Sequence, residues 1–240
     1  MLSRLSVRAN MITAYNGERI ERSFLVRKHN FYSIRTPWEV VSVLNLNETQ
    51  LAVIYGSIMG DAYLQSNGTN ARLRFEHSLN QEQYVVWKFN FLRNIFSDSA
   101  IIKLNRIHPI TKREYKYVRC QSKTLPELKK IRDIFYPEGK KIVPLNLKEY
   151  LMEPISLAVW FMDDGYYYLR DKCGYLYLGN VSKTEADTCC SVLKNNFDLV
   201  TKILAKKKGY ALYFPRIEML KLKEIINPFI IPSFRYKLPH

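Results

Sequence analysis

The sequence predicts a mixed α+β fold built from two pseudo-symmetric halves, each with helices and antiparallel strands in the order αββαββα. Two apolar segments of the same design, each ending at an aspartate, occur once in either half of the chain. Each is followed by strand-like segments with alternating apolar and polar residues and by further helix-like segments. With 240 residues, of which 47% are hydrophobic, the chain is long enough to bury one sizeable core around both segments.

The second apolar segment, residues 157–165, predicts a short buried helix. Pro154 lies just upstream, where proline suits the first turn of a helix, and Gly165 lies where a helix can end. This arrangement puts Asp164 at the C-terminal end of the helix, where the partial negative charge of the helix repels a carboxylate. A cation close to Asp164 is therefore expected. Taken alone, the segment is better explained as a helix that ends at a surface Asp-Asp-Gly turn.

The first apolar segment, residues 51–62, repeats this design. Asn47 and Gln50 have the spacing of a helix capping box, and the segment again ends near an aspartate, Asp61. Aligned without gaps, the two segments pair Asp61 with Asp164. One face of the first helix carries small residues spaced four apart, which are Ala52, Gly56 and Gly60. Without large side chains on this face, a second helix can approach closely. Two such helices side by side would bring the two aspartates together, which is costly unless metal ions lie between them.

The strongest strand signal of the first half is the alternation over residues 71–78. The predicted buried face comprises Leu73, Phe75 and His77, and the predicted charged face comprises Arg72, Arg74 and Glu76. The other elements expected in this half are a helix over 81–96 with an apolar stripe of Tyr84, Trp87, Phe91 and Ile95, a hairpin of 101–106 and 114–121, and a helix over 125–135.

The same pattern recurs in the second half. The expected elements are strands over 166–170 and 175–180, a helix over 184–196, strands over 201–205 and 210–215, and a helix over 217–226. The predicted organisation is a basic extension (1–45), a first half (46–136), a linker (137–153) and a second half (154–240). The linker is short, and each motif helix needs the other to bury it, so the halves are not expected to be independent domains.

Positive charge dominates the composition, with 37 Lys and Arg against 22 Asp and Glu, a formal net charge of +15. Such an excess indicates a polyanionic partner, most simply nucleic acid, although charge alone also fits a merely basic protein or one that binds a membrane surface. No apolar run reaches the length of a membrane span. The four cysteines and four histidines lack the spacing of metal ligands, which indicates reduced thiols and no zinc site.

Residues 1–45 differ from the rest of the chain. Met1–Gly17 contains no acidic residue and carries two arginines and two serines, a composition that suits an organellar transit peptide. Two other interpretations stay open: a basic arm, and a reading-frame extension with Met11 as the true start.

The two apolar segments, together with two lysine-bearing segments, resemble the LAGLIDADG homing endonucleases in their single-chain form with two motifs. Residues 54–62 resemble a degenerate first motif and residues 157–165 a better second copy. The segments 140–144 and 235–239 are similar to a yeast mitochondrial, intron-encoded member of that family. The resemblance extends over residues 46–240, and it implies a fold in which the motif helices pack at the centre and the two sheets form a DNA-binding saddle.

The resemblance and the chemistry of the motif ends together imply a magnesium-dependent DNA endonuclease. Asp61 and Asp164 are the expected catalytic residues and metal ligands, because Mg²⁺ prefers oxygen and often takes only one or two carboxylates beside a substrate phosphate. The backbone carbonyls of Gly60 and Asp163, at the helix ends, are expected as further ligands.

Two lysines match family positions near the scissile phosphates, Lys141 and Lys237. Each is expected to polarise the attacking water or to offset the charge of the transition state. Lys140 is an alternative to Lys141, one residue out of register.

The chain departs from the family at the water-binding positions. Relatives often carry a glutamine after the first strand that orients water in the active site. Here these neighbourhoods hold His77 and Ser78 in the first half, and Asn180 and Val181 in the second. We therefore expect an altered water network and unequal cleavage rates on the two DNA strands.

Basic residues in strands and hairpin tips are the expected DNA contacts, because such ribbons fit the major groove. They are Arg72, Arg74, Lys112, Arg113, Lys116, Arg119, Arg170, Lys206, Lys207 and Lys208. Each of them taken singly is better explained by a solvated surface charge, and only their shared placement in strands and hairpin tips favours DNA.

The sequence therefore predicts a monomeric homing endonuclease that uses Mg²⁺ to cut both strands of a long, asymmetric double-stranded DNA site and so promotes intron mobility. A second hypothesis is an intron maturase on the same fold, which binds structured group I intron RNA. Retention of both Asp61 and Asp164 favours the nuclease, because splicing does not need them. A third is a structural protein of an RNA–protein assembly. The expected location is an organelle, mitochondrion or chloroplast, with the bacterial cytoplasm as the alternative.

Overall fold

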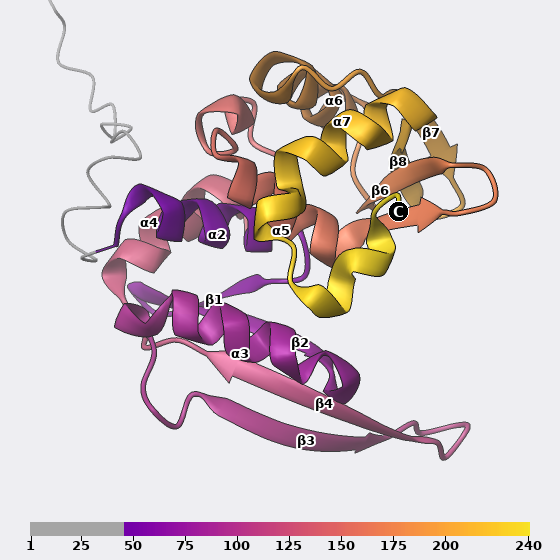
Figure 1. The fold of residues 1–240 in the computed structure, drawn as a ribbon. Coiled ribbons are helices and arrows are strands. Elements are labelled where there is room, and N and C mark those ends of the chain that lie inside the picture. Colours follow the sequence, from indigo (N-terminus) through magenta and orange to yellow (C-terminus); the bar gives the residue numbers. More distant parts are fainter. Residues whose placement is uncertain (1–45) are drawn as a thin grey trace, which may run out of the picture. The chain divides into compact units, whose positions relative to one another are not determined.

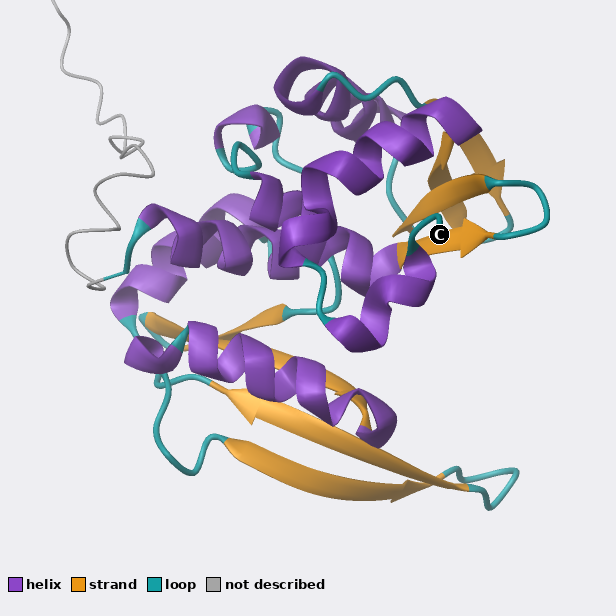
Figure 2. Ribbon diagram, viewed as in Figure 1, coloured by secondary structure: helices purple, strands orange, loops and turns teal. Residues whose placement is uncertain are grey.

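The computed structural model describes residues 46–240, which form a mixed α+β fold around two central helices (Figure 1). Figure 2 shows the strands gathered into two separate sheets, each with helices packed beside it. The extension predicted for residues 1–45 lies outside the described residues. Among the helices between residues 46 and 240, none combines the length and the apolar run that a membrane crossing requires.

The two central helices pack directly against each other and are α2 (Glu48–Met59) and α5 (Pro154–Asp164). The capping box predicted for α2 is confirmed, since the Asn47 side chain accepts the Gln50 N–H at 2.8 Å and the Gln50 side chain accepts the Asn47 N–H at 3.1 Å. A side chain at Gly56 would overlap the backbone of Ser156, so glycine is what allows the close approach that the small-residue spacing predicts. Both helices are buried along almost their whole length, which explains why they are apolar on every side.

The first sheet has the strand order β1-β2-β4-β3, with all neighbours antiparallel. Its strands are β1 (Tyr63–Asn67), β2 (Asn70–Ser78), β3 (Ile101–Ile107) and β4 (Glu114–Gln121). The alternation predicted for β2 is confirmed, because Leu73, Phe75 and His77 are buried and the alternating Arg72, Arg74 and Glu76 are half-buried. The sequence pattern does not reveal β1, since only Leu64 in that strand is buried.

Two helices pack on the first sheet, α3 (Glu82–Phe91) and α4 (Pro126–Phe135). Helix α3 ends earlier than predicted, and a 3₁₀ turn, Arg93–Ile95, follows it. Its fully buried stripe is also displaced from the predicted one. Trp87 and Phe91 are only partly buried, and the stripe instead consists of Tyr84, Val85, Lys88 and Phe89.

The second sheet repeats the first, with the order β5-β6-β8-β7 and antiparallel neighbours. Its strands are β5 (Gly165–Tyr168), β6 (Cys173–Gly179), β7 (Lys202–Lys206) and β8 (Gly209–Phe214), and its helices are α6 (Lys183–Phe197) and α7 (Arg216–Ile226). The order αββαββα is therefore present twice, as the sequence predicts.

Two segments outside this repeat return to the ends of the central helices. The stretch between α4 and α5 contains the 3₁₀ turn η3 (Leu147–Glu149) and carries Lys141. The chain after α7 runs through η4 (Asn227–Phe229) and η5 (Pro232–Lys237), and η5 packs on β5.

Candidate active site

The two motif helices end side by side. Helix α2 ends at Met59, and Asp61 follows one residue beyond the Gly60 cap, whereas Asp164 is the last residue of α5. The carboxylate Oδ2 of Asp163 accepts the backbone N–H of Asp61 at 3.2 Å, so the two ends are in direct contact. A side chain at Gly60 would overlap the Asp163 carboxylate, and the glycine therefore makes room for the acid of the other half.

One lysine donates hydrogen bonds to the last carbonyls of each motif helix, Lys141 from the segment between α4 and α5 and Lys237 from the chain after α7. The four contacts are Lys141 Nζ to Met59 O (3.2 Å) and Gly60 O (2.9 Å), and Lys237 Nζ to Met162 O (2.6 Å) and Asp163 O (3.2 Å). These are equivalent positions in the gapless alignment of the two motifs. A cation is favoured at a helix C-terminus, and Lys237 is the cation expected near Asp164. The carbonyls of Gly60 and Asp163, predicted as metal ligands, thus already accept a hydrogen bond from a lysine.

A buried ion pair lies beneath the helix ends. Lys88 Nζ donates to Asp163 Oδ1 at 3.0 Å and to Oδ2 at 3.1 Å, and both side chains are 0% exposed. The ammonium also lies 4.2 Å from the centroid of the Tyr84 ring and 5.4 Å from that of Phe75. A fully buried charge is tolerated only with a partner, and here carboxylate, ammonium and aromatic faces satisfy one another.

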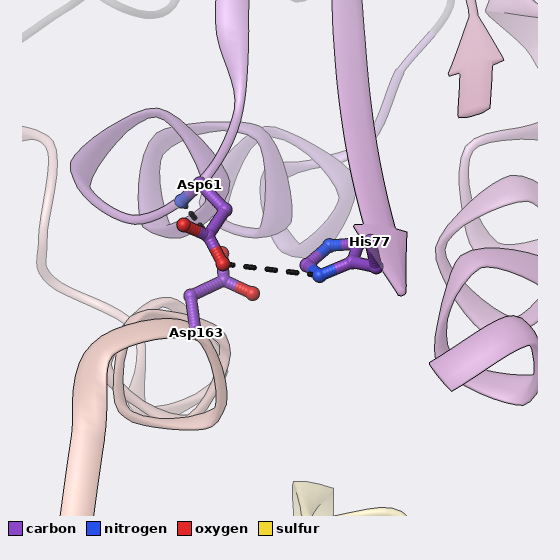
Figure 3. Close-up of side chains that lie close together, drawn as sticks. All are labelled: Asp61, His77 and Asp163. Carbon is purple, nitrogen blue, oxygen red and sulfur yellow. Dashed lines mark hydrogen bonds and ion pairs between the residues drawn. The ribbon is translucent and has the colours of Figure 1, made fainter. Parts of the chain in front are cut away.

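His77 lies beside Asp61 and Asp163 at this centre (Figure 3). Its Nδ1 lies 3.8 Å from Asp61 Oδ2, and its side chain is 3% exposed. Burial, and then the positive charge of Lys88, lower the pKa of His77 to about 4, so the imidazole is neutral at physiological pH. Ligand atoms of Asp61, His77 and Asp163 lie within 4.8 Å of one another, which makes this cluster a candidate metal site.

The pKa values of both motif aspartates are raised above the ordinary value of an aspartate. Burial, followed by repulsion from Asp61 and Asp163, raises the pKa of Asp164 to about 7. Burial and the Asp163 charge likewise raise the pKa of Asp61. Desolvation of the ammonium lowers the pKa of Lys141 and of Lys237, although the neighbouring aspartates oppose the shift. Carboxylates crowded together in a desolvated centre are the arrangement that a divalent cation relieves.

The open face of the first sheet carries arginines gathered around one carboxylate. Glu76 accepts from Arg74 at 3.3 Å, from Arg106 at 2.6 Å and from Arg119 at 2.8 Å. The predicted contacts Lys112, Arg113 and Lys116 are exposed in or beside the β3–β4 loop, and Arg72 Nε donates to the Gln65 side chain at 3.0 Å.

The second sheet carries tyrosines in place of arginines. Neighbouring rings are in contact, with centroid distances of 4.6 Å for Tyr166–Tyr168, 5.3 Å for Tyr168–Tyr175, 6.0 Å for Tyr175–Tyr177 and 5.4 Å for Tyr175–Tyr213. Of the predicted contacts, Lys206 places its Nζ 4.2 Å from the Tyr175 ring centroid. Lys207 and Lys208 are exposed in the β7–β8 turn, and Arg170 is exposed beside Asp171.

Comparison with known families identifies the family to which this fold belongs. Residues 51–222 match the LAGLIDADG DNA endonuclease family. The chain belongs to that family. Its LAGLIDADG motifs are thus the two apolar segments that carry Asp61 and Asp164.

Relatives of this LAGLIDADG chain include both endonucleases and maturases. It is 25% identical over 211 residues to the DNA endonuclease I-ChuI of Chlamydomonas applanata, covering 81% of this chain and 96% of the relative. It is 26% identical over 203 residues to the cytochrome b mRNA maturase bI2 of Debaryomyces hansenii, covering 80% of this chain and 74% of the relative. Several other curated relatives are matched over only about half of their own length.

A solved structure shares the LAGLIDADG fold. The homing endonuclease I-WcaI bound to its DNA recognition sequence superposes with a TM-score of 0.75 at 24% identity, covering 90% of this chain and 96% of that one. This structural similarity confirms the predicted fold class. At 24% identity it does not assign functions to individual residues of this chain.

The structure brings four of the predicted site residues to one centre: Asp61, Asp164, Lys141 and Lys237. The ten predicted DNA contacts lie instead in the two sheets and their loops. Sequence reasoning missed Lys88, although a lysine four residues after Tyr84 on an apolar helix face is a detectable signal of a buried charge.

Proposed function

We propose that this protein is a site-specific homing endonuclease that makes a magnesium-dependent double-strand break in a long, asymmetric DNA target and so promotes intron mobility. The observation that carries the proposal is the meeting of Asp61 and Asp164 from opposite halves, with one lysine donating to each helix end. The protein acts as a monomer, because one chain supplies both halves of the centre. The acid-free, arginine-bearing start of the chain favours an organelle as its location.

The donor set at the helix ends fits magnesium. Mg²⁺ takes oxygen ligands, and Asp61 and Asp164 are two carboxylates whose raised pKa values report burial and repulsion from neighbouring carboxylates. Both oxygens of Asp163 are bonded to Lys88, and His77 offers nitrogen, so neither is expected among the main ligands. When bound, the ion supplies an acidified water and stabilises charge on the phosphate.

The side chains at this centre have distinct proposed roles. Asp61 and Asp164 would hold the cation. Lys141 and Lys237, each fixed by two backbone carbonyls, offset the negative charge that develops on one scissile phosphate each. His77 is neutral and lies beside Asp61, so it is suited to hydrogen-bond a water there.

DNA recognition is assigned to the open faces and loops of the two sheets. The net charge of +15 favours a polyanion, and the ten predicted basic contacts lie in the two sheets and their loops. The arginine face and the tyrosine face differ chemically, which suits the two unlike halves of an asymmetric site.

A cleavage assay on a partly randomised DNA library, built around the sequence that flanks the reading frame, tests the proposal. We expect linear product with Mg²⁺, none with EDTA, and binding without cutting with Ca²⁺. Full cleavage in EDTA would contradict the metal-dependent mechanism, and no cleavage of any library member would contradict the nuclease.

The second candidate is an intron maturase, favoured by the similarity to the bI2 maturases of Debaryomyces hansenii and Saccharomyces cerevisiae. This function predicts tight binding to the host intron RNA and faster splicing in vitro, both insensitive to Asp61→Asn. An enclosing group I intron supplies the substrate for this assay, and its joined exons supply the DNA target for the nuclease assay, so the two functions are separable.

A further inference from the structure

We infer that Lys88 and Asp163 form a buried positioning pair that holds Asp61 in place, and that the Asp163 carboxylate is not a metal ligand. The catalytic consequence of this inference rests on the proposed function. The contact itself does not, because it is defined by hydrogen bonds within the protein.

The hydrogen bonds of Asp163 assign its role. Its two oxygens accept twice from Lys88 Nζ, at 3.0 Å and 3.1 Å, and Oδ2 also accepts the Asp61 N–H at 3.2 Å. A carboxylate has about four acceptor sites, and three of these are occupied. Figure 3 shows the Asp163 carboxylate turned toward Asp61, whose backbone N–H it accepts, so its oxygens are engaged within the protein.

The two motif aspartates need different support. Asp164 is the last residue of α5 and is held by the helix itself. Asp61 lies beyond the end of α2, its side chain is 48% exposed, and its backbone N–H is held by Asp163. The equivalent hold is absent in the other half, because Gly60 stands at the position that corresponds to Asp163 and has no side chain.

Lys88 fixes Asp163 in this orientation. It projects from α3 of the first half, whereas Asp163 belongs to α5 of the second, so the pair ties the halves together beneath the active centre. Its ammonium is confined by the Tyr84 and Phe75 rings, and the Tyr84 hydroxyl donates to Val159 O of α5 at 3.3 Å. Both charges are fully buried, so neither side chain can turn away without leaving the other unpaired.

Two double variants separate positioning from charge. Lys88→Met alone leaves a buried unpaired carboxylate and is expected to lower Tm by about 10 °C. Lys88→Met with Asp163→Asn removes both charges but keeps an oxygen that accepts the Asp61 N–H. Lys88→Met with Asp163→Ala removes both charges and the acceptor. Lys183→Met, which breaks an exposed pair with Asp187 on α6, is the matched control, with an expected Tm change of less than about 2 °C.

Three readouts are compared between the two double variants: hydrogen exchange of the Asp61 amide, Ca²⁺ affinity by calorimetry with target DNA present, and the Mg²⁺-dependent cleavage rate. We expect the asparagine variant to recover Tm and to keep Ca²⁺ affinity and cleavage within about threefold of the parent. The alanine variant is expected to expose the Asp61 amide to exchange and to lose about 10- to 100-fold in Ca²⁺ affinity and in rate, as losses of residues that orient a metal ligand do.

Two results would overturn the inference. Equal Asp61 exchange, affinity and rate in both double variants would show that Asp163 does not hold Asp61. An equal loss of Ca²⁺ affinity in both, with the Asp61 amide still protected in the asparagine variant, would show that the Asp163 carboxylate binds the ion itself. If the parent protein cuts no DNA, the proposed function fails, while the Asp61 exchange still decides whether the pair positions it.

Discussion

The two halves of this molecule share one order of elements and one strand order, yet they differ wherever chemistry is concerned. The first half ends its motif helix before Asp61 and surrounds Glu76 with arginines. The second half ends its motif helix at Asp164 and covers its sheet with tyrosines in mutual contact. The difference teaches that the repeated apolar pattern sets the framework, while unrepeated polar residues set what each half does.

The largest expected effect tests whether the two halves contribute equally to the centre. Asp61→Asn and Asp164→Asn should each abolish detectable cleavage, because each removes one of the two carboxylates proposed to hold the metal ion. DNA binding should stay intact or become tighter, since a negative charge near phosphate is removed. Cleavage and gel-shift assays on the same samples measure both. A variant that cuts at the parental rate would show that one half carries the chemistry alone.

A smaller effect concerns the pH dependence of metal binding. Burial and the neighbouring acids raise the pKa of Asp164 to about 7, so protons compete with the cation below that pH. Ca²⁺ affinity should therefore fall roughly tenfold between pH 8 and pH 6. His77 does not contribute, because its pKa lies near 4 and the imidazole stays neutral throughout. Calorimetry at both pH values measures the change, and a flat profile would mean that Asp164 does not bind the ion.

The smallest expected effect compares the charged turn of the second half with its tyrosines. Replacing Lys206, Lys207 and Lys208 by glutamine should reduce the slope of log Kd against log salt by about 0.9 for each DNA phosphate that a lysine no longer neutralises. Tyr177→Phe is the control, because it keeps the ring and removes no charge, and its slope should equal that of the parent. An unchanged slope in the triple variant would place this turn away from DNA.

The sequence predicted the framework well for a physical reason. Apolar periodicity, the Asn47 capping box and the small residues of α2 are local signals, and the structure confirms the helices, most strands and the close approach at Gly56. Strand β1 escaped prediction because only Leu64 in it is buried, and α3 was predicted too long.

The candidate site was predictable only in part. Asp61, Asp164, Lys141 and Lys237 stand at positions that the repeat and the family resemblance mark. Lys88 and Asp163 are far apart in the chain, and no local sequence pattern predicts that they form an ion pair between the two halves.

The central claim, that one pseudo-twofold centre cuts both DNA strands, is tested most directly by strand-labelled supercoiled plasmid carrying the target. Lys141 and Lys237 each donate to the end of a different motif helix, so each should serve one strand. Loss of such a charge-stabilising donor commonly costs about 10²- to 10³-fold. Lys141→Met should therefore leave one strand almost uncut and Lys237→Met the other, each giving nicked circles, with unequal rates for the remaining cuts. If both variants slow the same strand, or both strands equally, the two lysines do not serve separate phosphates and the pseudo-twofold account is wrong.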